Sequence, residues 1–251
     1  FVNLLSNTEV APISSGSGGC TSQQIHAYPF TNQKSVNRRV LLVETPGFAD
    51  PSCNDCEILE NICAWLDRFY RDNAEVAGIV YCHDITQKKW EGSTQKTFEV
   101  FQKLCGPAAA KKVVLLTTMW DNSTANALRS LEYREECLKN TYWKDMISKG
   151  SVVHRGKLTD EASRSIVSFF LAQDAFSIPL QIQQELVDMK KMLKNTEAGL
   201  TLSTMLRESL ATHNKRVKFL RKEGGNRQAI LDLEAETTKI KEQLTKLRNQ
   251  T

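Results

Sequence analysis

Short β-branched runs alternate with longer amphipathic stretches through the first two thirds of the chain. This alternation is typical of a parallel sheet covered by helices, an α/β architecture. Crossovers between such strands place ligand-binding residues at the carboxyl ends of the strands. The expected strands are 39–43, 77–81, 112–117, 151–154 and, at an edge, 23–28, and the expected helices are 56–71, 94–104, 125–140 and 161–171.

The last part of the chain has a different pattern. From Ile182 the apolar positions recur at alternating intervals of four and three, which predicts the narrow seam of an α-helical coiled coil. The seam breaks at Gly224 and Gly225 and then restarts. We therefore divide the chain into two regions, 1–180 and 181–251.

The predicted seam must be buried against something, and three arrangements are open. In the first, residues 226–249 fold back as an antiparallel helical hairpin. In the second, the whole segment pairs with another chain, and in the third it docks onto the first region. Residues 181–251 are accordingly the expected surface for a protein partner or for self-association.

Charge separates the same two regions. Of the 33 Lys and Arg and 29 Asp and Glu residues, 14 and 9 lie in 181–251, so this part has a net charge of +5 and the remainder has −1. A cationic helical segment raises the hypothesis of a polyanion partner, either nucleic acid or anionic lipid. The cations are interspersed with Asp and Glu, however, as on a solvated coiled-coil face, and no aromatic residues interleave for base stacking. Nucleic acid is therefore not the favoured partner.

The remaining composition points to a protein of a reducing compartment. Seven cysteines, an odd number, are scattered among apolar segments, which suits free thiols better than a disulfide framework. No apolar run approaches the roughly 20 residues that a membrane span needs. We expect a cytoplasmic protein without a membrane span.

An acidic residue and a Pro-Gly turn follow the strand predicted at 39–43. The sequence there reads Glu44-Thr45-Pro46-Gly47. A carboxylate at a strand end can hold Mg²⁺ through water, and the amide of a glycine just beyond can approach a terminal phosphate because no side chain blocks it. The alternative is an ordinary turn, because Pro-Gly turns are common.

The strand predicted at 112–117 also ends in polar residues. Thr118 follows it, and Asp121 stands three positions later. A fixed carboxylate at this edge is suited to accept two parallel hydrogen bonds from the ring NH and amino group of guanine. The alternative is that Asp121 caps the next helix. Two such motifs, in this order on two strand ends, are more specific than either one alone.

The first region resembles a known family. The stretches that carry the resemblance include "VLLVETPGFAD", "GIVYCHDIT", "FEVFQKLCG", "VVLLTTMWD" and "YWKDMISKGS". They resemble the fungal G-domain proteins, P-loop GTPases similar to the septin, Toc-receptor and immunity-associated branch, over about residues 1–180. The resemblance implies a three-layer P-loop NTPase fold with a parallel sheet, GTP or GDP as ligand and Mg²⁺ as cofactor.

The phosphate-binding motif G-x-x-x-x-G-K-[ST] of that family is absent from the sequence. In the family, the stretch that corresponds to 1–7 follows directly on this loop. The resemblance therefore implies that the first strand and its P-loop lie just ahead of Phe1, and that the chain is an N-terminally truncated fragment.

The resemblance also assigns roles to individual residues. Thr21 resembles the switch threonine that closes over the γ-phosphate and Mg²⁺, its alternative being a flexible Ser/Gly-rich loop. Glu44 stands where the second switch motif usually has Asp, so it is the second candidate ligand of Mg²⁺, partly through water. The implied nucleotide-binding residues are Thr21, Thr45, Pro46, Gly47, Thr118, Asp121 and His154, with Arg155 as the alternative to His154 beside the base.

Two departures from the family pattern bear on the chemistry. Phe48 stands where many GTPases have the glutamine that orients the attacking water, so hydrolysis is expected to be slow or to depend on a partner. Met119 replaces the usual lysine beside the base. The sequence names no catalytic residue.

The expected function is a GTP-binding switch, with slow Mg²⁺-dependent hydrolysis read out through the coiled coil. One alternative is a non-catalytic G domain that serves as an interaction scaffold. The other is an ATP-preferring P-loop NTPase, which Met119 keeps open.

Overall fold

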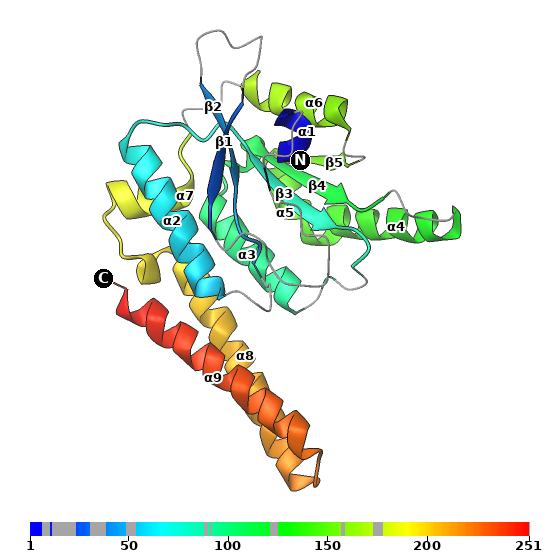
Figure 1. Cartoon of the computed structure of the whole chain (residues 1–251), viewed down its shortest axis with the longest axis vertical. Helices are drawn as coiled ribbons and strands as arrows, with labels where there is room; N and C mark the ends of the chain where they lie inside the picture. Colours follow the sequence, from blue (N-terminus) through cyan, green and yellow to red (C-terminus); the bar gives the residue numbers. More distant parts are fainter. Residues whose placement is uncertain are drawn as a thin grey trace.

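Three parallel strands form the central sheet of the molecule (Figure 1). They are β3 (Ile79–Asp84), β4 (Val113–Thr118) and β5 (Val152–Arg155), in the order β3-β4-β5. The computed structural model describes residues 1–6, 11, 24–30, 39–48, 54–87, 90, 92–120, 125–156, 159–172 and 178–250.

The middle strand, β4, is buried on both faces, and every residue from Val113 to Leu116 is at most 1% exposed. This burial explains its unbroken apolar sequence, because the helices of a parallel sheet cover both of its faces. The sequence predicted this sheet at 77–81, 112–117 and 151–154, and the structure confirms all three strands.

Two further strands form a separate antiparallel pair in the described part of the chain. Strands β1 (His26–Phe30) and β2 (Val40–Glu44) align His26 with Glu44 and Phe30 with Val40. The prediction that 39–43 pairs within the parallel sheet is therefore wrong for the described residues. Leu41 is 46% exposed, so β2 lacks the two-sided cover of β4 and instead has the half-exposed character of antiparallel strands.

Four longer helices accompany the strands, close to the predicted positions. They are α2 (Asp55–Arg71), α3 (Ser93–Cys105), α4 (Ala125–Cys137) and α6 (Asp160–Leu171). Helix α2 shows why the local prediction succeeds. The side chain of Asn54 accepts hydrogen bonds from the amides of Cys56 (3.0 Å) and Glu57 (3.3 Å), and acidic residues occupy the first turn. This part also contains the short helices α1 (Val2–Ser6) and α5 (Lys144–Ser148), a 3-10 turn, η1 (Ala110–Lys112), and a π-helical turn, η2 (Leu138–Tyr142).

The C-terminal residues form an antiparallel helical hairpin (Figure 1). Helix α8 (Glu197–Lys222) and helix α9 (Arg227–Asn249) meet at Gly224, whose φ of 64° is readily adopted by glycine. The hairpin also docks, with α8 against α3 and α9 against α2. Two of the three arrangements that the sequence left open therefore occur together, whereas coiled-coil pairing with another chain stays a prediction.

The first stretch of the predicted seam does not form one continuous helix. It contains α7 (Gln181–Gln183), a π-helical turn (Gln184–Asp188) and a 3-10 turn (Leu193–Asn195). The buried carboxylate of Glu185 explains the break. It pairs with Lys191 at 2.9 Å and accepts a hydrogen bond from the amide of Glu197 at 3.1 Å, at the start of α8.

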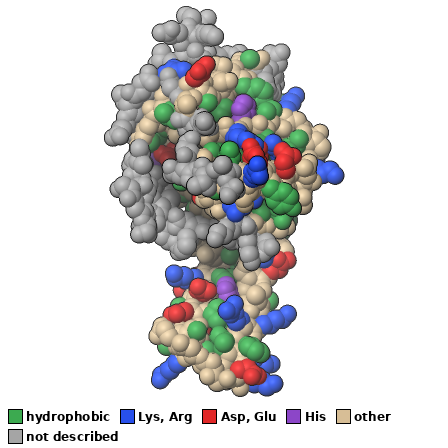
Figure 2. All heavy atoms as spheres, turned by 90° about the vertical axis from the view of Figure 1, so that its right-hand side faces the viewer, with side chains coloured by type: hydrophobic (Ala, Val, Ile, Leu, Met, Phe, Trp, Pro, Cys, Tyr) green, Lys and Arg blue, Asp and Glu red, His purple; other side chains and the backbone are tan. Residues whose placement is uncertain are grey.

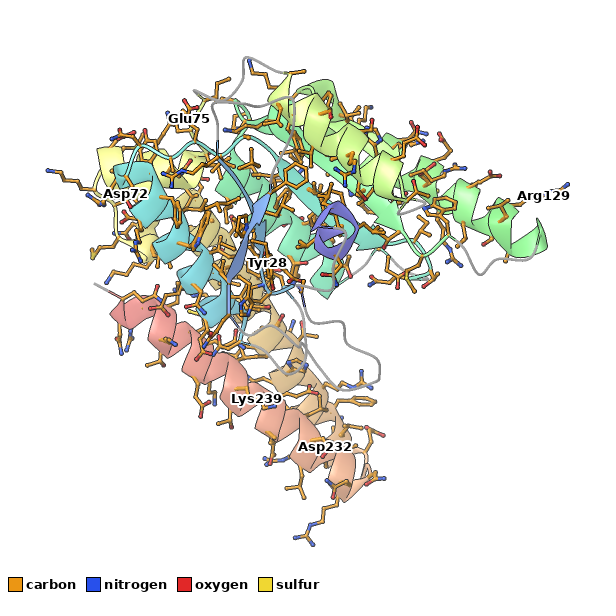
Figure 3. The ribbon with its side chains drawn as sticks, turned by 45° about the horizontal axis from the view of Figure 1, so that its top comes forward. Tyr28, Asp72, Glu75, Arg129, Asp232 and Lys239 are labelled. Carbon is orange, nitrogen blue, oxygen red and sulfur yellow. The ribbon has the colours of Figure 1, made fainter. Side chains whose placement is uncertain are left out.

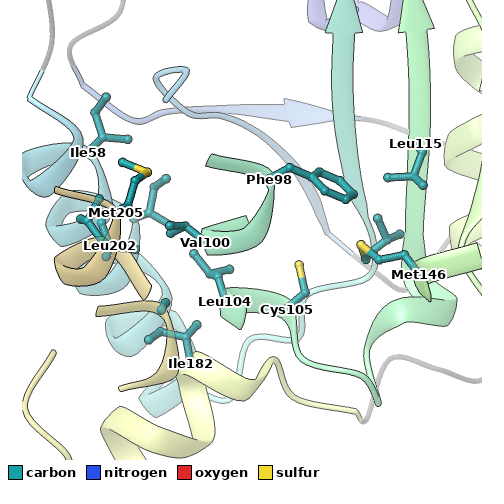
Figure 4. Close-up of a cluster of buried hydrophobic side chains, with 14 of the residues drawn as sticks. Ile58, Phe98, Val100, Leu104, Cys105, Leu115, Met146, Ile182, Leu202 and Met205 are labelled. Atoms are coloured by element: carbon teal, nitrogen blue, oxygen red, sulfur yellow. The ribbon is translucent and has the colours of Figure 1, made fainter. Parts of the chain in front are cut away.

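One large apolar core joins the α/β region and the hairpin. Figure 4 shows Ile58 from α2, Val100 from α3 and Leu202 from α8 directed into a common cluster. Among the described residues, no helix is long and apolar enough to cross a membrane.

Candidate functional site

The carboxyl ends of the three parallel strands lie along one edge of the sheet. The register pairs Asp84 of β3 with Thr118 of β4, and Thr117 with Arg155 of β5. The hydroxyl of Thr118 donates a hydrogen bond to the backbone oxygen of His83 at 3.2 Å. The predicted site residues Thr118 and His154 therefore belong to the same edge.

The chain turns sharply after β4. Met119 has a φ of 66° and is 56% exposed, whereas Trp120 is buried. The indole NH of Trp120 donates to the backbone oxygen of Thr117 at 3.2 Å and to its hydroxyl at 3.1 Å. The tryptophan thus packs back against the strand end and directs Met119 outward. Asp121, the predicted guanine ligand, lies outside the described residues.

A charged network supports the neighbouring end of β5. The Arg155 guanidinium donates to Glu135 of α4 at 2.6 Å and lies 4.3 Å from the centre of the Trp120 ring. Burial by itself raises the pKa of Glu135, but hydrogen bonds from Arg155 and Lys139 outweigh it and hold the pKa below its ordinary value. Arg155 is therefore a positioning group at this edge.

The sequence did not single out Glu135. An acidic residue in an amphipathic helix ordinarily faces solvent, yet this one is 2% exposed. It also accepts a hydrogen bond from the hydroxyl of Thr117 at 3.1 Å. Only the packing of α4 against the sheet brings these groups together.

His154 is held at the edge through its backbone. It aligns with Leu116 in the register, and its backbone oxygen lies 3.4 Å from the Thr117 hydroxyl, whose proton is donated to Glu135. Its side chain is half-buried. The position fits a residue that flanks a ligand at the strand ends.

The end of β3 contributes a second group that the sequence did not single out. Asp84 accepts hydrogen bonds through one carboxylate oxygen from the amide of Thr86 at 2.8 Å and from its hydroxyl at 2.7 Å. The preceding His83 is buried, and burial lowers its pKa to about 4 despite the opposing effect of Asp84. The edge thus combines a fixed carboxylate with a neutral imidazole.

The second part of the candidate site follows β2. Thr45 and Gly47 are exposed, and no described atom lies within 4 Å of the place that a Cβ on Gly47 would take. Glycine has no side chain to shield its amide from a ligand. Phe48 is half-buried and packs against the large core. Pro46, between the two exposed residues, is buried.

Glu44 carries an unsatisfied oxygen. Its Oε2 atom is buried and has no hydrogen-bond partner among the described residues. Buried polar atoms are nearly always paired, so such an oxygen is available for a cation or for a water bound to one. At Glu44, as in the rest of the described chain, no group of three or more His, Cys, Asp or Glu residues could hold a metal ion.

The structure thus brings the predicted residues together in two groups. Thr118 and His154 share the parallel sheet, whereas Glu44 ends β2 of the antiparallel pair and Thr45, Pro46 and Gly47 follow it. No hydrogen bond or ion pair links these groups among the residues that the structure describes. Thr21, like Asp121, falls outside them.

Comparison with known proteins gives structural matches alone. No protein-family model matches the chain, and no curated protein does. A crystal structure of a dimerization-deficient mutant of Toc33 from Arabidopsis thaliana matches with a TM-score of 0.53 and 14% identity, over 69% of this chain and 79% of that chain. Toc33 in complex with GDP and Mg²⁺ matches with a TM-score of 0.49 and 15% identity, over 61% of this chain and 62% of that chain.

The first of these similarities establishes the fold. The chain has the α/β architecture of a G domain, with the parallel sheet β3-β4-β5 as its centre. The prediction of a G-domain fold from the residues of the first region is thereby confirmed at the level of architecture.

Proposed function

We propose that this protein binds GTP or GDP together with Mg²⁺, hydrolyses GTP slowly and passes the nucleotide state to its C-terminal helices. The observation that carries the proposal is the set of polar residues at the strand ends of a G-domain fold. Open α/β sheets bind their ligands at the carboxyl ends of the strands, where these residues lie.

The guanine base is assigned to the end of β4. Asp121 would accept the hydrogen bonds of the base, with Thr118 at the head of the motif and His154 beside it. The support is the common edge that Thr118 shares with Asp84 and His154, and the outward direction of Met119. An exposed apolar side chain at this place suits contact with the flat face of a base.

The phosphates and Mg²⁺ are assigned to the end of β2. Mg²⁺ usually retains several waters and binds one or two carboxylates together with substrate phosphates, so it needs no cage of protein side chains. The unpaired buried oxygen of Glu44 fits that role, and the amide of Gly47, which no side chain of its own shields, fits contact with a phosphate. Thr21 is the second proposed ligand. When bound, the ion would neutralise phosphate charge.

The readout is assigned to the contact between α2 and α9. Helix α2 is the element that follows Gly47 and Phe48 along the chain. The ammonium group of Lys246 on α9 lies 3.0 Å from Glu57 and 3.5 Å from Glu60 of α2. Leu247 beside it is 2% exposed. A displacement of α2 by bound nucleotide would therefore move the hairpin.

A second candidate function is a non-catalytic interaction scaffold. The position of Phe48 favours it, because this side chain packs against the core where a water-orienting glutamine would be expected. A third candidate is a P-loop NTPase that prefers ATP. Met119 favours it, because without the usual lysine beside the base the selection of guanine would depend on Asp121 alone.

Calorimetric titration with GTP, GDP and ATP, each with Mg²⁺, tests the proposal. It is performed on the 251-residue chain and on a version of it extended at the N-terminus by a phosphate-binding loop. Binding of guanine nucleotides by either form supports the proposal, and binding by neither overturns it in favour of the scaffold. Preference for ATP would favour the third candidate.

Asp121→Ala in the nucleotide-binding form tests the base assignment. Losing two charge-assisted hydrogen bonds should lower the preference for GTP over ATP by at least about 100-fold, because each has a net worth of about 1.5–3 kcal/mol and every 1.4 kcal/mol is tenfold. Asp232→Ala is the matched control on the exposed side of α9, labelled in Figure 3. Equal selectivity in both variants would show that Asp121 does not read the base.

A further inference from the structure

The end of the α8–α9 hairpin carries an excess of positive charge. His213 on α8 pairs with Glu236 on α9, and the residues beyond this pair, 214–235, include six Lys and Arg residues and three acidic residues. All six cations are exposed, and Arg221 pairs with Glu234. The other five have no ion-pair partner among the described residues, and we call them the tip cations: Lys215, Arg216, Lys218, Lys222 and Arg227.

Packing does not account for this arrangement. The predicted seam of α8 contains the half-buried residues Val217 and Leu220. Lys215, Phe219 and Lys222 follow one another at intervals of four and three, on the face about half a turn away from that seam. All three residues on this face are exposed, so their identity is not set by the interior of the hairpin.

Helix stability does not account for it either. Cations in the last turn of a helix interact favourably with the helix dipole, which explains Lys222. Lys218 and Lys215 lie one and two turns earlier. There the like-charge pair Lys218 and Lys222, four residues apart, is mildly destabilising.

Apolar side chains lie beside the tip cations. Phe219 is 62% exposed and Leu231 is 48% exposed, the former on the same face of α8 as Lys215 and Lys222. Figures 1 and 2 show the hairpin projecting away from the α/β region, with Lys and Arg side chains extending from it. The tip can therefore meet an extended surface while the α/β region stays clear of it.

We propose that the hairpin tip binds the anionic surface of a phospholipid bilayer. Clusters of four to eight cations on a helix are attracted to acidic headgroups, and an exposed phenylalanine among them enters the headgroup region. A single-stranded nucleic acid would need several stacking platforms, and Phe219 is the sole aromatic residue of 181–251. A lipid surface is therefore the partner that matches both the positive charge and the exposed apolar groups. This interaction is independent of the proposed nucleotide binding.

Vesicle flotation with the full chain tests the proposal. The probes are vesicles of phosphatidylcholine with about 30% phosphatidylserine, and vesicles of phosphatidylcholine alone. We expect binding to the acidic vesicles that weakens as salt is raised, because screening acts on exposed charges. No binding to acidic vesicles at low salt would overturn the proposal.

Substitution of three tip cations locates the binding surface. The variant Lys215→Gln, Lys218→Gln, Lys222→Gln should bind acidic vesicles about 100-fold less, since each cation contributes about fivefold. The control removes equal charge from the exposed residues Arg207, Lys239 and Lys241, also by change to Gln, and should lose less than about tenfold.

Phe219→Ser should lower binding further without changing the salt dependence. Circular dichroism and the unfolding midpoint verify that all variants fold like the parent. Equal loss in the two charge variants would overturn the assignment to the tip. Displacement of the chain from vesicles by duplex DNA at equal charge concentration would overturn it in favour of nucleic acid.

Discussion

Strand β4 has an unbroken apolar run and the outer half of the hairpin, residues 211–236, has regularly spaced apolar residues, yet the structure covers the two segments differently. Val113, Val114 and Leu115 of β4 are 0% exposed. In the outer half of the hairpin no residue is buried, and Val217, Leu220 and Leu233 are half-buried at best. Apolar spacing alone therefore does not measure how much stability a segment contributes.

The difference follows from the number of neighbouring layers. The sheet has helices on its faces, whereas each helix of the outer half has a single neighbour. Buried apolar surface contributes about 25 cal/mol per Å², so the sheet and its helices should dominate the free energy of unfolding. The outer half, largely free of packing constraints, is where surface residues can change to suit a partner.

The largest effect is expected at the aromatic centre beneath the sheet. Trp143 is 0% exposed, and its ring lies 6.0 Å from His83 and 5.8 Å from Trp90, centre to centre. Trp143→Ala should lower the free energy of unfolding by about 3–5 kcal/mol, because it leaves a large cavity. Urea unfolding measures the change.

Two further variants sharpen this test. Trp143→Phe should cost less, because it keeps a ring and removes an indole NH that has no partner among the described residues. Tyr133→Ala, at a side chain that is 73% exposed, should change stability by less than about 0.5 kcal/mol. A loss below about 1 kcal/mol for Trp143→Ala would contradict the conclusion that this aromatic cluster dominates the free energy of unfolding.

The same cluster should make stability depend on pH. His83 has a folded-state pKa of about 4, lowered by burial from an ordinary value of 6.5. Between these values the unfolded chain binds the proton more tightly, so stability is lost as the pH falls from about 6.5 towards 4. The expected loss is about 3 kcal/mol, since each pKa unit corresponds to 1.36 kcal/mol.

His83→Phe removes the titrating group while keeping a flat ring beside Trp90, 4.7 Å away between centres. The free energy of unfolding of this variant should vary much less with pH between 6.5 and 5, a range above the ordinary pKa of carboxylates. Parallel pH profiles for parent and variant would show that His83 is accessible to protons in the folded state.

The fold was predictable from sequence where burial and local signals agree. Strand β4 has an unbroken apolar run because it is covered on both faces, and α2 has an Asn54 cap ahead of a regular apolar stripe. The pairing of β2 was not predictable, since a strand's partner depends on contacts distant in sequence. Glu185 likewise interrupts a regular seam through contacts made only after folding.

The candidate site divides in the same way. The common edge of Thr118 and His154 follows from the rule that parallel strands present their carboxyl ends together. The Arg155–Glu135 pair and the unpaired oxygen of Glu44 depend on side-chain packing that no local pattern encodes. Sequence therefore located the edge, and the folded structure identified the charges that shape it.

The same substitution at two places on α9 tests the contrast between the two ends of the hairpin directly. Leu247, which packs into the large core near α2, is 2% exposed, whereas Leu231 in the outer half is 48% exposed. Leu247→Ala should lower the free energy of unfolding by about 2–3 kcal/mol, and Leu231→Ala by less than about 0.5 kcal/mol. Because both changes replace leucine by alanine in one helix, helix propensity affects them equally, and urea unfolding reports the difference in burial. Similar losses would mean that the outer half contributes to stability as strongly as the docked end. The identity of its exposed residues would then be attributed to the stability of the fold and not to a binding partner.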